Sequence, residues 1–140
     1  MNETAADILS YIPQRPPFVM VDRVMASNET STKSAFRIQE DNIFVEGGKL
    51  KEPGLVENIA QTAAARAGFK ALSEDQPVKI GFIGGIRNLR VFGFPDVGSE
   101  IETEITIVNQ VFDVSVISGK VTCKGMLLAV CEMKIFIINQ

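Results

Sequence analysis

The sequence of 140 residues contains no histidine. Without an imidazole, the chain alone can form neither a Ser-His-Asp triad nor a Cys-His pair, and it lacks the commonest zinc ligand. Its two cysteines, Cys123 and Cys131, are too few for a disulfide framework or for a zinc site made of thiolates, so no metal site is expected. Any chemistry that the chain performs alone must therefore use carboxylates, lysines, hydroxyls, thiols or backbone amides.

Long apolar runs are missing as well. No stretch approaches the roughly 20 apolar residues that span a bilayer, and the first twenty residues lack the basic start and apolar run of a signal peptide. Lys and Arg number 14 against 17 Asp and Glu, a net charge of −3, which argues against broad attraction to nucleic acid or membranes. We expect a cytoplasmic protein with one domain over residues 1–140.

One long helix is predicted over residues 53–72. Pro53 suits a first helical position, and Ala60, Ala63, Ala64, Ala65 and Ala67 are strong helix formers. Apolar side chains go nearly all the way round it, with Asn58, Gln61 and Arg66 as the exceptions. Such a helix is normally buried on several sides.

The remaining segments favour strands. The pattern predicts a short helix over 4–9, two strands before the long helix and about four after it, with a glycine-containing loop over 39–52. The clearest segments are Phe18–Ala26, Thr32–Ile38, Glu100–Ile107, Val111–Val121 and Met126–Ile138. This order predicts an α+β fold in which an antiparallel sheet curls around a central helix.

A two-residue hairpin turn is expected at Lys124-Gly125. That register pairs Cys123 with Met126 and sets Cys131 opposite Ser118, so the thiols do not meet. Both cysteines are expected to be small core residues.

Four segments of the chain, in order, resemble bacterial 3-hydroxyacyl-acyl-carrier-protein dehydratases. They are IPQRPPFVMVDRV (Ile12–Val24), PGLVENIAQTAA (Pro53–Ala64), FIGGIRNLRVFGFPDVGSEIETEI (Phe82–Ile105) and VCEMKIF (Val130–Phe136). The resemblance implies the hotdog fold, an antiparallel sheet wrapped around one long central helix. It also implies a dimer in which two sheets join edge to edge.

The chain departs from these dehydratases where they carry histidine. Their Gly-His-Phe segment contains the base that takes the α-proton, and here the corresponding stretch is Phe44–Gly48. The histidine of their first motif is replaced by Gln14. Glu57, four residues before Gln61, matches the dehydratase glutamate, so the resemblance implies a catalytic role for Glu57. The short loop before the helix resembles a subgroup from polyene and aryl-lipid pathways.

Dehydration of a 3-hydroxyacyl thioester needs a base, an acid for the leaving hydroxyl and a donor for the thioester oxygen. Free N–H groups at the helix start, around Gly54 and Leu55, are the expected donors. For Glu57, the helix dipole favours the carboxylate and an apolar tunnel favours the neutral acid. If Gly54 is the N-cap, Glu57 stands at the third helical position and can instead have a capping role.

Other candidate residues have a structural alternative too. Gln61 lies one turn from Glu57 and can bind Glu57 or substrate, or be an ordinary buried amide. Tyr11 can act as a hydroxyl donor, or it can be a packing residue. Gly48, Gly84 and Gly85 can let the backbone approach a pantetheine arm, or form a bend or bulge. Neither glycine-rich stretch matches a phosphate loop or a dinucleotide fingerprint.

Basic residues concentrate in residues 66–90. This stretch contains five basic residues and two acidic ones, Glu74 and Asp75, which gives a local charge of 5 − 2 = +3. Lys79, Arg87 and Arg90 are the candidates for docking an acidic acyl carrier protein or the phosphates of CoA. The alternative is a scattered, solvated surface that also includes Arg66 and Lys70.

Three functions stay open on the sequence. The first is a dehydratase-like protein that binds 3-hydroxyacyl thioesters, carried by an acyl carrier protein or CoA, in fatty-acid or polyene-type lipid biosynthesis. Lacking histidine, it is either a weak enzyme that depends on Glu57 or a degenerate subunit that supports an active partner. The assembly is a homodimer or a heterodimer with an active dehydratase. The second is a thioesterase in which Glu57 activates water. The third is a non-catalytic acyl-binding protein. No cofactor is expected.

Overall fold

The computed structural model describes residues 8–77 and 80–138. One long helix packs against a six-stranded antiparallel sheet, as the fold prediction required. A small two-stranded sheet, β3–β4, precedes the helix. The elements are η1 (Ile8–Ser10), β1 (Arg23–Ser27), β2 (Ser31–Arg37), β3 (Val45–Glu46), β4 (Lys49–Leu50), α1 (Glu52–Ser73), β5 (Ile80–Val91), β6 (Glu100–Val111), β7 (Val114–Cys123) and β8 (Met126–Ile138).

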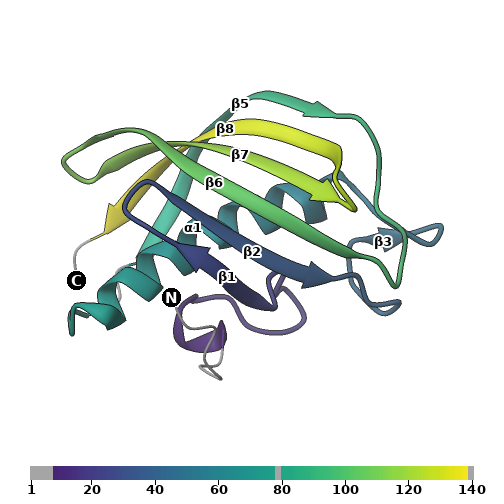
Figure 1. Cartoon of the computed structure of the whole chain (residues 1–140), viewed down its shortest axis with the longest axis horizontal. Helices are drawn as coiled ribbons and strands as arrows, with labels where there is room; N and C mark the ends of the chain where they lie inside the picture. The colour runs from purple at the N-terminus through teal and green to yellow at the C-terminus, as the bar shows by residue number, and fades with distance from the viewer. Residues whose placement is uncertain (1–7, 78–79, 139–140) are drawn as a thin grey trace.

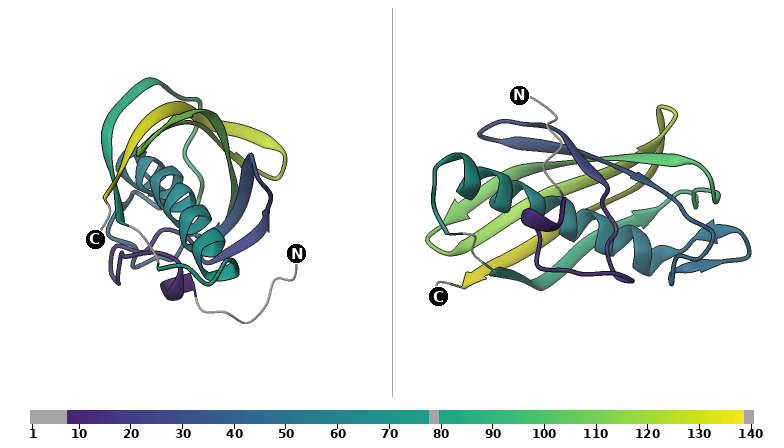
Figure 2. Two further views of the ribbon diagram at one scale, coloured as in Figure 1. Left: turned by 90° about the vertical axis from the view of Figure 1, so that its left-hand side faces the viewer. Right: turned by 90° about the horizontal axis from the view of Figure 1, so that it is seen from below.

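The large sheet has the strand order β1-β2-β6-β7-β8-β5 (Figure 1). It curls around α1, and the segment before β1 crosses the open side beside the helix (Figure 2). β5 is an edge strand of twelve residues. Within the part of the chain that the structure describes, no helix is long and apolar enough to cross a membrane.

The helix begins and ends within one residue of the predicted bounds. Lys51 is the N-cap, and Pro53 stands in the first turn, where its missing N–H costs nothing. Side chains on several sides of α1 are buried, as expected from its composition. Gly119 of β7 lets the sheet approach, because a Cβ there would press on Ile59 of the helix.

Most strand predictions are confirmed, and the exceptions have physical reasons. β8 has the predicted bounds and lies between two strands, and Ile101, Thr103 and Ile105 of β6 are buried on one face. The first strand begins only at Arg23. The predicted loop contains the β3–β4 hairpin, with Gly47 and Gly48 at positive φ in its turn. Of the predicted first helix, only Ile8 and Leu9 lie in the described residues, in η1.

The Lys124-Gly125 turn is confirmed, with positive φ at both residues and Cys123 opposite Met126. The predicted pairing of Cys131 with Ser118 is wrong, because Cys131 faces Gly119. A register shift at Val121/Thr122 moves the partner by one residue. Cys131 is buried and Cys123 half-buried, and burial raises the pKa of the Cys131 thiol to about 11.

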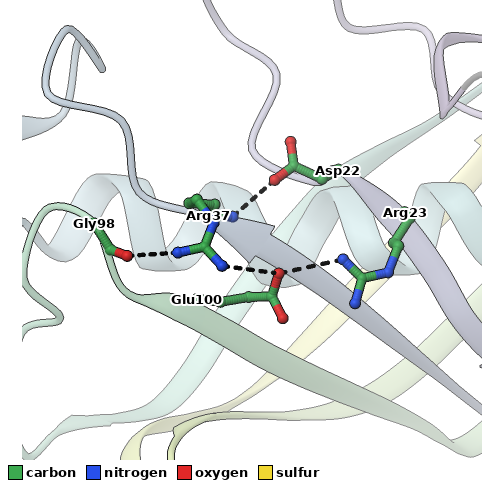
Figure 3. A network of polar contacts seen from close by, with 5 residues as sticks. All are labelled: Asp22, Arg23, Arg37, Gly98 and Glu100. Atoms are coloured by element: carbon green, nitrogen blue, oxygen red, sulfur yellow. Dashed lines mark hydrogen bonds and ion pairs between the residues drawn. The ribbon is translucent and has the colours of Figure 1, made fainter.

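The Asp22-Arg23 pair of the first motif ties the start of β1 to the sheet (Figure 3). The backbone N–H of Arg37 donates to Asp22 Oδ2 at 2.7 Å. The guanidinium groups of Arg23 and Arg37 both approach Glu100 Oε2, at 3.2 and 3.8 Å, and Arg37 also donates to the Gly98 carbonyl at 2.6 Å. These contacts join β1, β2 and β6, so this part of the motif has a structural role.

Candidate functional site

Glu57 lies in a cleft of about 260 Å³ between α1 and the edge formed by β5 and β8. Small side chains of the helix form one wall, and apolar strand residues form the other. The residues that line the cleft are Pro13, Gln14, Glu57, Ala60, Ala63, Ala64, Ala67, Gly81, Phe82, Ile83, Ile135 and Ile137. Glu57 is the only ionisable side chain among them, which makes it the natural centre for chemistry in this cleft.

Gln61 holds the Glu57 carboxylate in place. Its Nε2 donates to Glu57 Oε2 at 2.9 Å and to the Phe18 carbonyl at 2.8 Å, while its Oε1 accepts from the Met20 N–H at 2.6 Å. The amide orientation is fixed by these partners, because only its oxygen can accept from a backbone N–H. The hydrogen bond to Glu57 uses only its Oε2 atom, which leaves Oε1 of Glu57 for another partner.

The same amide anchors the segment before β1 to the helix. Gln61 binds the Met20 N–H, and Asn58 Nδ2 donates to the Met20 carbonyl at 2.7 Å, so both backbone groups of Met20 are bonded to helix side chains. Asn58 Oδ1 accepts from the Thr103 hydroxyl of β6. The backbone groups of Phe18 and Met20 thus bond to side chains of the helix instead of to a neighbouring strand. This explains why β1 starts later than its apolar pattern predicts.

The helix start differs from the prediction in two ways. Because the N-cap is Lys51, Glu57 lies in the second turn, and a capping role at the third position is wrong. The N–H groups of Gly54 and Leu55 are not free, since both donate to the Lys51 carbonyl, at 3.0 and 3.2 Å. They cannot also serve a thioester oxygen while the helix keeps this geometry.

The predicted glycines lie elsewhere. Gly48 is exposed in the β3–β4 turn, and neither it nor Gly84 or Gly85 lines the Glu57 cleft. The register of β5 against β8 shifts between Ile83 and Gly85, so the alternative of a strand bulge is confirmed. A Cβ on Gly84 would overlap the ring of Phe136, which stacks on Phe82 with centroids 5.8 Å apart. Gly84 thus makes room for this aromatic pair.

Arg66 lies apart from the candidate docking residues Arg87 and Arg90, which both lie on β5. Arg66 reaches the carbonyls of Asn28 and Glu29 in the β1–β2 turn, whereas Arg87 on β5 pairs with Glu132 at 3.0 Å. β1 and β5 are opposite edges of the sheet. Arg90 is exposed on β5, and Lys79 lies outside the described residues. Tyr11 packs edge-on against Phe69, with centroids 5.7 Å apart, which confirms its packing role.

A second cleft, of about 370 Å³, continues from the first. The two share Ala63, Ala67 and Ile135, and the second runs on toward the end of α1 between Lys70 and Ile117. The helix therefore borders one extended, mainly apolar space with Glu57 near one end. A flexible aliphatic chain is the kind of group that such a space accommodates.

The sequence analysis missed Gln14 as a site residue. It lines the cleft together with Glu57, and its Oε1 is buried without a hydrogen-bond partner among the described residues. A signal was available, because Gln14 replaces a histidine of the resembling dehydratases. An amide in a loop between prolines has no periodic pattern that would otherwise single it out.

Comparison with known proteins decides the family. A family model described as ApeP-like, ApeP dehydratase, matches residues 6–140. The chain belongs to the ApeP-like dehydratase family. It is also 30% identical over 135 residues to the 3-hydroxyacyl-[acyl-carrier-protein] dehydratase FabZ of Cronobacter sakazakii, covering 87% of this chain and 88% of that protein. FabZ of Escherichia coli is 29% identical over the same length and coverage.

Similar solved structures agree with a hotdog fold for this chain. The dehydratase heterocomplex ApeI:P from Xenorhabdus doucetiae matches with a TM-score of 0.90 and 17% identity, covering 98% of this chain and 94% of that chain. A hypothetical thioesterase with coenzyme A from Streptococcus pneumoniae matches with a TM-score of 0.67 and 10% identity, covering 84% and 85%. At these identities the likeness shows the fold alone.

Proposed function

We propose that this ApeP-like chain binds 3-hydroxyacyl thioesters and works as one subunit of a heteromeric dehydratase. One observation carries the proposal: Glu57, held by Gln61, opens onto an apolar space in a chain that contains no histidine. The chain offers a positioned carboxylate and room for an acyl group, but no imidazole base. The base then comes from a partner subunit.

In this proposal Glu57 protonates the leaving 3-hydroxyl, and a histidine of the partner removes the proton from C2. Gln61 is a positioning residue, because its donated hydrogen bond fixes the Glu57 carboxylate. The thioester oxygen needs a donor other than Gly54 and Leu55, whose N–H groups are bonded within the helix. That requirement also favours a site completed by a second chain.

The edge strand β5 is the surface where we place the partner. Apolar side chains are exposed on and just after it, with Phe82 52%, Ile86 42% and Phe92 59% accessible. A long edge strand with exposed apolar residues favours pairing with another strand. Phe82 also lines the Glu57 cleft, so a partner on this edge would stand beside the site. The likeness to the dehydratase heterocomplex ApeI:P supports a heteromeric assembly.

The test is intact mass spectrometry of a 3-hydroxyacyl carrier protein. It is incubated with this chain alone, with a hotdog subunit that carries the Gly-His-Phe segment alone, and with both together. We expect loss of one water to be fastest with both, and very slow with this chain alone. Glu57→Gln in the mixture should lower the rate by about 10²- to 10⁴-fold.

Glu40→Gln is the matched control, because Glu40 is exposed and lies outside the cleft. It should leave the rate of the mixture unchanged. A mixture in which Glu57→Gln dehydrates as fast as the natural chain would contradict the assignment of Glu57. Release of the free acid instead of the enoyl product would favour the thioesterase function.

A further inference from the structure

Two buried side-chain polar atoms have no hydrogen-bond partner among the described residues, Gln14 Oε1 and Arg66 Nε. Of these, only Gln14 lines the cleft that contains Glu57. A buried acceptor left unpaired is destabilising, so an unpaired acceptor in a native structure requires an explanation. Its place in the cleft that contains Glu57, which is large enough for a ligand group, suggests that a ligand supplies the missing donor.

The backbone around Gln14 is held on both sides. Arg15 Nη1 donates to the carbonyls of Ile12 and Gln14, each at 2.8 Å. Further along, Gln61 binds Phe18 and Met20, as described above. Before it, Tyr11 lies so close to α1 that a Cβ on Gly68 would overlap the Tyr11 carbonyl oxygen. The segment is thus fixed against the helix, and the unpaired oxygen belongs to a preorganised wall of the cleft.

We propose that Gln14 is a specificity-determining residue that recognises the 3-hydroxyl group of the acyl chain. This inference rests on the proposed function. A hydroxyl group has one donor and can accept as well, so it can donate to Gln14 Oε1 while it receives a proton from Glu57. A saturated acyl group has no hydroxyl, and the enoyl product has lost it. Gln14 therefore favours the substrate over its product and over saturated chains.

The experiment compares the binding of 3-hydroxyoctanoyl-pantetheine and octanoyl-pantetheine, measured by isothermal titration calorimetry. It uses the full chain together with the histidine-containing subunit of the previous experiment, in which the histidine of the Gly-His-Phe segment is replaced by alanine so that the hydroxylated ligand is not dehydrated during the titration. The natural chain should prefer the hydroxylated ligand by about 3- to 10-fold, the range expected for one uncharged hydrogen bond. Gln14→Met, which keeps length but loses the amide, should abolish the preference by weakening only the hydroxylated ligand.

Two further variants keep the test decisive. Gln14→Asn retains the amide but withdraws it by one methylene, and should lose the preference as well. Gln39→Met is the matched control, because Gln39 is exposed and lies outside the cleft, and it should retain the preference. Thermal unfolding of each variant reports whether the fold is intact.

The outcomes separate this inference from the proposed function. The role of Gln14 would be overturned if the natural chain bound both ligands with equal affinity, or if Gln14→Met lowered the affinity for both ligands equally. Either result would leave the proposed function standing. Failure of the natural assembly to bind either ligand would overturn the proposed function, and this inference with it.

Discussion

On one side of α1, Asn58, Gln61 and Thr62 are fully buried, and their polar groups bond to other parts of the chain. Thr62 Oγ1 donates to the Asn58 carbonyl at 2.8 Å and lies 2.7 Å from Ser34 Oγ of β2. Asn58 and Gln61 bind the backbone of Met20. We call this the anchoring side, because it fastens α1 to the segment before β1 and to the sheet.

On the adjoining side, Glu57, Ala60 and Ala64 face the cleft toward β5 and β8, and we call this the cleft side. Here the helix carries methyl groups and one carboxylate, and the wall opposite includes an unpaired amide oxygen. Polar groups that are satisfied within the chain stabilise the fold, whereas those left open need a ligand. The comparison predicts that variants on the anchoring side affect stability and variants on the cleft side affect binding.

The largest effect on stability is expected for Gln61→Ala. The change leaves the Met20 N–H and the Phe18 carbonyl without their partner, and it removes three hydrogen bonds of about 1 kcal/mol each. Urea denaturation should show a loss of about 3 kcal/mol in the free energy of unfolding. Gln39→Ala, an exposed amide, should change it by less than about 0.5 kcal/mol. A loss below about 1 kcal/mol for Gln61→Ala would break the distinction between the two sides.

Gly68→Ala tests the anchoring side through sterics. Helix propensity alone predicts that the free energy of unfolding rises by about 1 kcal/mol, because alanine is a better helix former than glycine. The added Cβ would overlap the Tyr11 carbonyl, and overpacking costs about 1–3 kcal/mol, or more when backbone must move. We expect a net loss of about 1–2 kcal/mol on urea denaturation. Gly85→Ala, where a Cβ meets nothing within 4 Å, should have little effect.

Ala60→Leu should have a small effect on stability and a large one on binding. Ala60 lines the cleft, so the longer side chain fills space that would otherwise take a ligand. We expect the free energy of unfolding to change by less than about 1 kcal/mol. Calorimetry should show that the affinity for octanoyl-pantetheine falls at least about tenfold. Unchanged affinity would mean that the acyl chain does not lie along this face of α1.

The smallest effect is expected for Asp22→Asn, and it depends on pH. Burial raises the pKa of Asp22 above the ordinary value of 3.8, so ionising the carboxyl costs more in the folded chain than in the unfolded one. The contribution of Asp22 to stability therefore falls as the pH rises through the raised pKa. Asparagine can still accept the hydrogen bond from the Arg37 N–H. The free energy of unfolding of the variant should therefore rise relative to that of the natural chain between pH 4 and pH 7.

That gain should vanish below pH 3.8, where Asp22 is protonated in both states. The measurement is the free energy of unfolding of both chains across this range. A variant that is less stable than the natural chain at pH 7 would mean that the charge of Asp22 is needed by Arg23 and Arg37.

Sequence alone predicted what depends on local pattern. The helix and β8 follow from composition and apolar pattern, and the Lys124-Gly125 turn follows from the conformations that hairpins require. The start of β1 and the partner of Cys131 were missed, because they depend on side chains of a distant helix and on a bulge. Glu57 was predicted from a resemblance. Gln14 was noted only as a replacement for a histidine, because no local pattern shows that its segment lines the same cleft.

The cleft draws its walls from four parts of the chain, residues 13–14, 57–67, 81–83 and 135–137. During synthesis the first two emerge early, and the final wall emerges only with the end of β8. A nascent chain halted before Ile135 has the Glu57 carboxylate, the Gln14 amide and residues 81–83, but lacks the part of the opposite wall that β8 supplies. The cleft is therefore complete only once β8 has emerged, and the cleft side of α1 lacks this wall until then.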